Sequence, residues 1–330
     1  MQIYNSLNEL NISDRTSLAL GNFDGLHIGH RKIMETAINS ANASGLKSLC
    51  FTFSNHPFNF IMRREDDDPD AVKLICSEDE KIRLIEEMGF DILVNIPFDE
   101  HIMTMKAEDF FSHIIKDRLN AGCISVGFNY SYGARAGGNS DTLKEECDKA
   151  GIEINILEAV RVESEIVSST LIREMIRIGN MELTSVYLGR PYSFKGTVSH
   201  GKRLGSAMGI PTVNIPAPTD VMLPPSGVYY SRIVVDGIEY KSVSNIGTRP
   251  TVTEQSSDIK DIVLNSNMQT AQAKNIETNI FDFNGDLYGK DIVVYFDHFS
   301  RGEVKFSTKE ELFDQIRRDC ESAVEYHKKR

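Results

Sequence analysis

Two histidines three residues apart follow the first apolar run of the sequence, in the stretch GNFDGLHIGH at residues 21–30. The run ends at Gly21, as in a strand that turns directly into a helix. Such a turn exposes unpaired backbone N–H groups that attract anions. His27 and His30 share a face on the first helical turn, where imidazoles can donate hydrogen bonds to phosphate oxygens. The stretch therefore indicates a phosphate site, in which Asp24 either orients one ring or meets an amine of the substrate.

A second candidate stretch, VSSTLIRE at residues 167–174, follows a later strand of the same half. Ser169 and Thr170 would cap a helix N-terminus there, and Arg173 lies one turn farther on. A run of this kind alone is most simply a plain helix cap. Its position after a strand, with Arg173 one turn on, favours a contact with phosphate.

The third candidate is GKRLGSAMGIPTVNI at residues 201–215, which combines glycines with Lys202 and Arg203. Thr212 and Asn214 lie two residues apart, on one side of an extended chain. Their hydroxyl and amide oxygens are hard ligands that suit Mg²⁺, which completes its shell with phosphate and water. Taken alone, the P-T-V-N run could equally be an ordinary strand edge. The spacing of a P-loop is absent.

The elements that must position these residues differ between the two halves. The first half predicts buried strands at residues 17–20, 47–53, 91–96, 123–128 and 152–157. Helices are expected after Gly29, from a capping box of Ser77 and Glu80, and over about residues 107–119. This alternation predicts a doubly wound parallel sheet, whose ligands bind beyond the carboxyl ends of the strands.

The second half predicts short β-rich runs, at residues 227–235, 238–247, 275–283 and 291–299. Asp236-Gly237 and Asn284-Gly285 are favoured hairpin dipeptides between them, so we expect an antiparallel barrel, of six strands. Ser307 and Glu310 are predicted to open a terminal helix whose apolar stripe packs on the barrel. The expected domains are residues 1–188 and 189–330.

Composition limits the classes of function. The 330 residues are 41 % hydrophobic and 25 % charged, as in globular proteins. The net charge of −12 disfavours nucleic-acid partners, although small phosphates can bind at a local basic cluster. No apolar stretch predicts a membrane span or a secretory signal. Five scattered cysteines argue against a zinc site or a disulfide framework. We expect a cytoplasmic protein, either a monomer or a weak homo-oligomer.

The H-I-G-H run resembles the signature of the nucleotidylyl-transferase superfamily. Taken with the other motifs, nearly the whole chain resembles the bacterial bifunctional riboflavin kinase/FAD synthetase family. The motifs that carry this resemblance are, in chain order, GNFDGLHIGH, GFNYSYG, SSTLIRE, LGRPYSFKGTVSHGKRLG, GIPTVNI, GVY, NIGTRPT, IETNIFDFNGDLYG and SRGEVKF. The resemblance implies that the carboxy-terminal barrel phosphorylates riboflavin with MgATP to give FMN. It also implies that the amino-terminal domain joins AMP from ATP to FMN, giving FAD and pyrophosphate.

For the adenylyl-transferring domain, the resemblance implies that His27 and His30 are catalytic and bind phosphate. The further ATP and phosphate contacts that it implies are Gly21, Phe23, Asp24, Gly29, Asn129, Ser168, Ser169, Thr170 and Arg173. Pro57 and Phe58 stand where the family contacts flavin, although core packing explains them equally well.

For the kinase domain, the resemblance implies that Thr212 and Asn214 bind Mg²⁺ and that Glu277 is the catalytic base. The implied contacts with ATP in this domain are Gly201, Lys202, Gly205, Thr212 and Asn214. Arg301 and Glu303 match the residues that lie near the flavin ring.

Two departures from the family pattern stand out. Residues 252–275 form a longer polar segment than the family usually has, which we expect to be a hairpin or a loop, and Asn279 stands where many members carry His. Two alternatives remain open: an enzyme that retains one of the two activities, and a flavin-binding regulatory protein without turnover. Intact motifs at both sites disfavour the first, and turnover of ATP would exclude the second.

Overall fold

The computed structural model describes residues 1–65, 68, 70–199, 211–248 and 274–329. The chain forms two compact units. The first contains Met1–Arg173, Tyr187–Gly189 and Thr219–Met222, and the second contains Glu174–Val186, Arg190–Pro218 and Leu223–Arg330. No helix among the described residues is both long enough and apolar enough to cross a lipid bilayer.

The first unit is built on a six-stranded sheet with the order β1-β4-β3-β2-β5-β8. Every neighbouring pair of strands is parallel. The strands are β1 (Gln2–Tyr4), β2 (Thr16–Leu20), β3 (Lys47–Phe53), β4 (Ile92–Ile96), β5 (Ala121–Gly127) and β8 (Glu153–Leu157). The predicted parallel sheet is confirmed, but the sequence analysis missed β1, whose three residues are too few to show a period.

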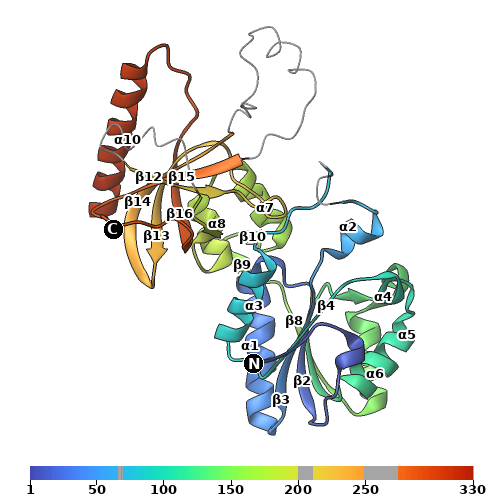
Figure 1. The fold of residues 1–330 in the computed structure, drawn as a ribbon. Helices are drawn as coiled ribbons and strands as arrows, with labels where there is room; N and C mark the ends of the chain where they lie inside the picture. The colour runs from blue at the N-terminus through green and yellow to red at the C-terminus, as the bar shows by residue number, and fades with distance from the viewer. Residues whose placement is uncertain (66–67, 69, 200–210, 249–273, 330) are drawn as a thin grey trace. The chain divides into compact units, whose positions relative to one another are not determined.

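Helices cover both faces of this sheet, which confirms the doubly wound fold (Figure 1). Its helices are α1 (Ile28–Ser44), α2 (Pro57–Ile61), α3 (Glu78–Glu87), α4 (Glu100–Thr104), α5 (Ala107–Asp109), the π-helix η3 (Phe110–Arg118) and α6 (Ser140–Ala150). The shorter elements are η1 (Leu7–Glu9), η2 (Asp24–Leu26), β6 (Ser131–Tyr132), η4 (Ala134–Ala136), β7 (Gly138–Asn139), β9 (Arg161–Val162) and β10 (Glu165–Ile166). The helix α7 (Ser169–Ile178) starts in this unit and ends in the second.

The alternation of side chains along each strand separates two cores. Ala19 and Cys50 point to the face that α1 and α3 cover, where Met34 and Ile85 are fully buried. The adjacent residue Leu18 belongs to the other core, with residues of η3 and α6. Successive strand residues point to opposite faces, so a central strand covered on both sides reads as one continuous apolar run.

The second unit is an antiparallel sheet with the order β11-β16-β13-β14-β15-β12. Its strands are β11 (Tyr192–Thr197), β12 (Thr212–Pro216), β13 (Gly227–Val235), β14 (Ile238–Thr248), β15 (Lys274–Ile280) and β16 (Asp291–Gly302). Ser199, just after β11, forms an antiparallel bridge with Asn214 of β12, which brings the two edge strands together. The expected six-stranded antiparallel barrel is therefore confirmed.

In the described part of the chain, the second unit also contains the end of α7, most of α8 (Met181–Leu188) and α10 (Lys309–Lys328). Ala323 of α10 is fully buried and belongs to one apolar cluster with Val228 of β13 and Val243 of β14. This contact confirms that the apolar stripe of the terminal helix packs on the sheet, and Figure 1 shows α10 beside β14.

Three local predictions need correction or fall outside the description. Asp236-Gly237 does close the β13–β14 hairpin, with positive φ at both residues. Asn284-Gly285 closes no hairpin, because β15 and β16 are not neighbours in the sheet. The cap of α10 is Thr308, not Ser307, since Thr308 accepts from the N–H of Glu311. Of the long polar segment, residues 252–273 lie outside the described part of the chain.

Candidate functional site

The first candidate site lies where the strand order of the parallel sheet reverses. From β2 the chain continues to β3 and then β4 on one side, whereas β5 and β8 lie on the other side. His27 follows the carboxyl end of β2, and Asn129 follows the carboxyl end of β5. Ligands of open α/β sheets bind in the crevice at this switch point. The fold thus places both residues beyond the carboxyl ends of two adjacent strands.

Two glycines make room for the rings of this site. A Cβ on Gly21 would lie 2.8 Å from the ring of Phe23, which is fully buried and has a positive φ of 49°. A Cβ on Gly29 would lie 3.1 Å from the ring of His27. Gly21 and Gly29 therefore shape the turn by allowing these two side chains to fold back on it.

The two imidazoles stack on each other, with ring centroids 3.6 Å apart and planes 18° apart. His27 is the N-cap of α1, and its Nδ1 accepts a hydrogen bond from the backbone N–H of His30 at 3.2 Å. An accepting Nδ1 carries no proton, so the neutral ring of His27 holds its proton on Nε2. Burial, with a smaller effect of His27, holds the pKa of His30 well below its usual value. The pair is thus neutral and can donate hydrogen bonds to an anion.

Asp24 forms a buried ion pair with Arg173. Its other carboxylate oxygen accepts from the N–H of Ile75 at 3.0 Å. Burial raises the pKa of Asp24, although the charge of Arg173 acts in the opposite direction. Arg173 also donates to the carbonyl of Lys73 at 2.9 Å. The structure thus holds Arg173 at the edge of the site through Asp24, a pairing that the sequence analysis did not foresee.

The S-S-T run begins α7, as predicted, and of its three residues it is Ser168, not Ser169 or Thr170, that caps the helix. Ser168 Oγ accepts from the N–H of Leu171 at 3.2 Å, which is the bond of an N-cap residue. Ser169 instead donates to the backbone carbonyl of Asp24 at 3.1 Å, and Thr170 is exposed. Ser169 therefore ties the start of α7 to the turn that carries the histidines.

The sequence analysis missed two residues at this edge of the sheet, Lys81 and His56. Lys81 is 7 % exposed, and its ammonium donates to the carbonyl of Phe53 at the end of β3. Burial and then the nearby charges of Arg173 and Lys81 lower the pKa of His56 to about 4. Two cationic side chains thus lie near one neutral imidazole. A lysine within the apolar face of a helix was the signal that could have identified Lys81.

Unpartnered polar atoms are also concentrated here. Within the described part of the chain, His30 Nδ1, Arg31 Nε and His56 Nδ1 are buried without a hydrogen-bond partner. Buried polar groups are nearly always hydrogen-bonded, so groups like these mark places where a ligand or water completes the bonding. His30 and Arg31 lie in the first turn of α1, and His56 lies near Arg173 and Lys81, which is consistent with the proposed anion site.

Pro57 and Phe58 begin the short helix α2, close behind His56 in the chain. Phe58 is 44 % exposed, and the guanidinium of Arg64 lies 5.5 Å from the centroid of its ring. Core packing, the alternative left open for Phe58, therefore does not describe this side chain.

The second candidate site lies on the edge strand β12 and its neighbour β15. Asn214 is paired with Glu277, and Thr212 with Asn279. The backbone register therefore places the two proposed cation ligands and the proposed base on one face of the sheet. Glu277 is exposed, Thr212 is partly exposed and Asn214 is buried.

The sequence analysis gave no role to the two asparagines on either side of Glu277, Asn275 and Asn279. Asn275 Nδ2 donates to Asn214 Oδ1 at 2.8 Å. Asn279 Nδ2 donates at 2.8 Å to the carbonyl of Pro211, the first residue of the P-T-V-N run. Both contacts tie β15 to that run, and the period of two along β15 was the signal that could have identified them.

The other residues proposed for the kinase site are distributed differently. Arg301 forms a two-point ion pair with Asp319 of α10, at 3.0 and 2.6 Å. Glu303 lies against Gly247 of β14, where a Cβ would come within 2.7 Å of its carboxylate. Gly201, Lys202 and Gly205 lie outside the described residues.

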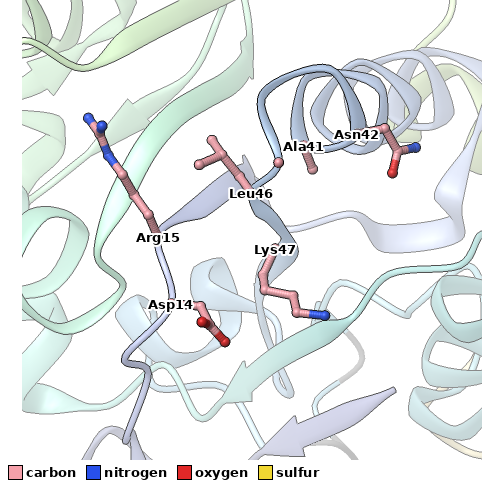
Figure 2. Close-up of a pocket in the computed structure, with 7 residues that line it drawn as sticks. Asp14, Arg15, Ala41, Asn42, Leu46 and Lys47 are labelled. Carbon is pink, nitrogen blue, oxygen red and sulfur yellow. The ribbon is translucent and has the colours of Figure 1, made fainter.

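A polar pocket of about 360 Å³ lies at the amino ends of the parallel strands, opposite the end that carries His27 (Figure 2). Arg15 and Lys47 line it at the starts of β2 and β3, together with Asn42 and Gly45 at the end of α1. Because His27 follows the carboxyl end of β2, this pocket is not part of the site around the histidines.

Comparison with known proteins assigns the two halves separately. Residues 10–171 match the family model described as FAD synthetase, and residues 188–327 match the model described as riboflavin kinase. The chain is 33 % identical over 313 residues to the bifunctional riboflavin kinase/FMN adenylyltransferase of Bacillus subtilis, with 94 % of this chain and 92 % of that protein covered. The chain belongs to this family. The resemblance that the motifs carry is thereby confirmed.

Other comparisons agree on the family or on the fold. The protein of the same description from Listeria monocytogenes is 30 % identical over 304 residues, which cover 92 % of this chain and 89 % of that protein. A crystal structure from Streptococcus pneumoniae, described as a macrolide-efflux protein, matches with a TM-score of 0.83 and 28 % identity over 98 % of both chains. The two-unit fold is thus shared along its whole length, whereas the efflux description belongs to that protein.

Proposed function

We propose that this chain carries both activities of its family, adenylyl transfer to FMN on residues 1–188 and phosphorylation of riboflavin on residues 189–330. The observation that carries the first assignment is the neutral, stacked pair of His27 and His30 at the strand-order switch point. ATP and FMN are the substrates at that site, and FAD and pyrophosphate are the products.

In adenylyl transfer, an FMN phosphate oxygen attacks the α-phosphate of ATP and pyrophosphate leaves. No side chain needs to become a nucleophile, because positioning and stabilisation of charge supply the catalysis. His27 Nε2–H and the N-terminus of α1 are suited to hold the phosphate oxygens. Lys81 adds positive charge behind the turn, and Arg173 becomes a phosphate ligand when it leaves Asp24.

In the kinase reaction, Glu277 accepts the proton of the ribityl hydroxyl as that oxygen attacks the γ-phosphate of ATP, the bond from the γ-phosphorus to the bridging oxygen breaks, and ADP leaves. The side chains present fit Mg²⁺, because Thr212 and Asn214 offer neutral oxygens beside a carboxylate on the same face of the sheet. We propose that these two side chains hold the ion, which neutralises charge on the phosphates when bound. An amide oxygen has two lone pairs, so the hydrogen bond from Asn275 is compatible with a cation ligand on the same atom.

The substrates and the five cysteines without a disulfide partner favour the reducing cytoplasm as the compartment. The assignment of function is tested by incubating the full chain with riboflavin, ATP and Mg²⁺ and separating the flavins by chromatography. We expect FMN to form first and FAD to follow. Formation of FAD from supplied FMN, but no FMN from riboflavin, would leave one activity only. Flavin binding without any consumption of ATP would refute both.

A further inference from the structure

Two buried amides meet beside the proposed base of the kinase site. Asn275 lies two residues before Glu277 on β15 and is 4 % exposed. Asn214 lies opposite Glu277 on β12 and is 5 % exposed. Asn275 Nδ2 donates to Asn214 Oδ1 at 2.8 Å, with both atoms away from solvent. A buried hydrogen bond of this kind is costly to break, because the amide that remains loses its partner.

The contact decides which way the Asn214 amide faces. Rotation of the terminal amide by half a turn exchanges its oxygen and its nitrogen, and only the oxygen can ligate a cation. With Asn275 oriented as in the structure, its N–H attracts the oxygen and repels the NH₂ group of Asn214, so it favours one of the two orientations of that amide. Since an amide oxygen has two lone pairs, a hydrogen bond from Asn275 is compatible with a cation ligand on the same atom. Ligands of metal sites are commonly oriented by partners of this type.

We propose that Asn275 is a positioning residue of the kinase site, whose amide orients the Asn214 oxygen toward the cation. This inference rests on the proposed function, because it takes Asn214 as the cation ligand. It assigns a role to a residue that the family motifs leave unassigned. The proposed role is to position Asn214, and it requires no contact of Asn275 with the phosphates or the flavin.

The test uses the full chain and the cation itself as probe. Binding of Mn²⁺ in the presence of ADP is measured from the electron paramagnetic resonance signal of the free ion. The part of the binding that is lost in Asn214→Ala defines the kinase site and separates it from the amino-terminal site. Asn275→Ala removes the donor, and Asn275→Leu removes the donor but keeps most of the side-chain volume.

Thr278→Val is the matched control on the same strand. Thr278 is fully buried and bonds Ser244 at 2.7 Å, so its loss perturbs β15 without removing the contact with Asn214. We expect both Asn275 variants to weaken Mn²⁺ binding at the kinase site by about 10-fold or more, while Thr278→Val stays within about 2-fold of wild type. The concentration of Mg²⁺ needed for half-maximal FMN formation should rise by the same factor, with the KM for riboflavin unchanged.

Three results would overturn the proposal. The first is wild-type Mn²⁺ affinity in both Asn275 variants. The second is weakening in Asn275→Ala but not in Asn275→Leu, which would make packing the cause. The third is a further loss from Asn275→Ala in the Asn214→Ala background, since a residue that acts through Asn214 has no effect once Asn214 is gone. Failure of the proposed function is distinguishable, because the wild-type chain itself would then form no FMN from riboflavin.

Discussion

Replacement of His27 by two different residues separates its structural role from its chemical role. The ring caps α1 through Nδ1, and our proposal is that its Nε2–H binds phosphate. Asparagine is also a good N-cap, so His27→Asn keeps the cap and removes the donor, because its amide ends one bond short of the position of Nε2. His27→Ala removes both. The two variants therefore share the chemical defect and differ in the structural one.

The magnitudes follow from the contacts. Loss of an N-cap costs about 1 kcal/mol, and loss of a ring stacked at 3.6 Å adds roughly 0.5–1.5 kcal/mol in both variants. Urea unfolding should thus find His27→Ala less stable than His27→Asn by about 1 kcal/mol. Loss of one preorganised donor lowers kcat by about 10²–10³-fold, so FAD formation from FMN should fall by a similar factor in both.

Formation of FMN from riboflavin by the same samples is the internal control, because the kinase site lies in the other unit. FAD formation at the wild-type rate in His27→Asn would refute the assignment of Nε2–H as a phosphate donor. Equal stability of the two variants would refute the cap.

The remaining predictions concern both sites and the effect of pH. Glu277→Gln should lower the rate of FMN formation by at least about 10²-fold and leave the rate of FAD formation from supplied FMN unchanged, as measured by product chromatography. His30→Ala should do the reverse, and loss of both activities in either folded variant would contradict the division of labour. Because the pKa of His56 is lowered to about 4, the unfolded chain binds a proton below pH ~6.5 that the folded chain does not. The free energy of unfolding should therefore decrease as the pH is lowered from about 6.5 to about 4. The decrease should be less than the full ~1.4 kcal/mol per pH unit, because the ring is partly exposed. His56→Asn should flatten this slope in urea titrations at pH 7 and pH 5. Gly21→Ala should destabilise the first unit by roughly 1–3 kcal/mol in thermal unfolding, because its Cβ overlaps the buried ring of Phe23, and an unchanged midpoint would exclude that contact.

The sequence predicted the elements better than the contacts between them. Buried strands such as β3 are continuous apolar runs, so their residue types alone indicate a parallel sheet covered on both faces. Asp236-Gly237 specifies its hairpin because both residues accept positive φ. Asn284-Gly285 has the same local chemistry, yet the strands around it pair with other strands. Strand order is decided by contacts across the sheet, which no local pattern contains.

The same limit explains which site residues were missed. The His27–His30 stack depends on residues three apart, so spacing could predict it. The pairing of Asp24 with Arg173 joins residues 149 positions apart and depends on how α7 returns to the β2 turn.

This ion pair also bears on how the amino-terminal site works. Asp24 is buried with a raised pKa, so its carboxylate is costly to keep charged without Arg173. An incoming phosphate would compete with Asp24 for the guanidinium, and release of Arg173 would leave Asp24 with the backbone N–H groups of Ile75 and Cys76 and the nearby charge of Lys81. Lys81 therefore makes the exchange less costly, because a second cation remains near the carboxylate. With the phosphate-binding role that we propose for Arg173, binding of triphosphate and repositioning of Arg173 would be a single coupled event near the N-terminus of α7.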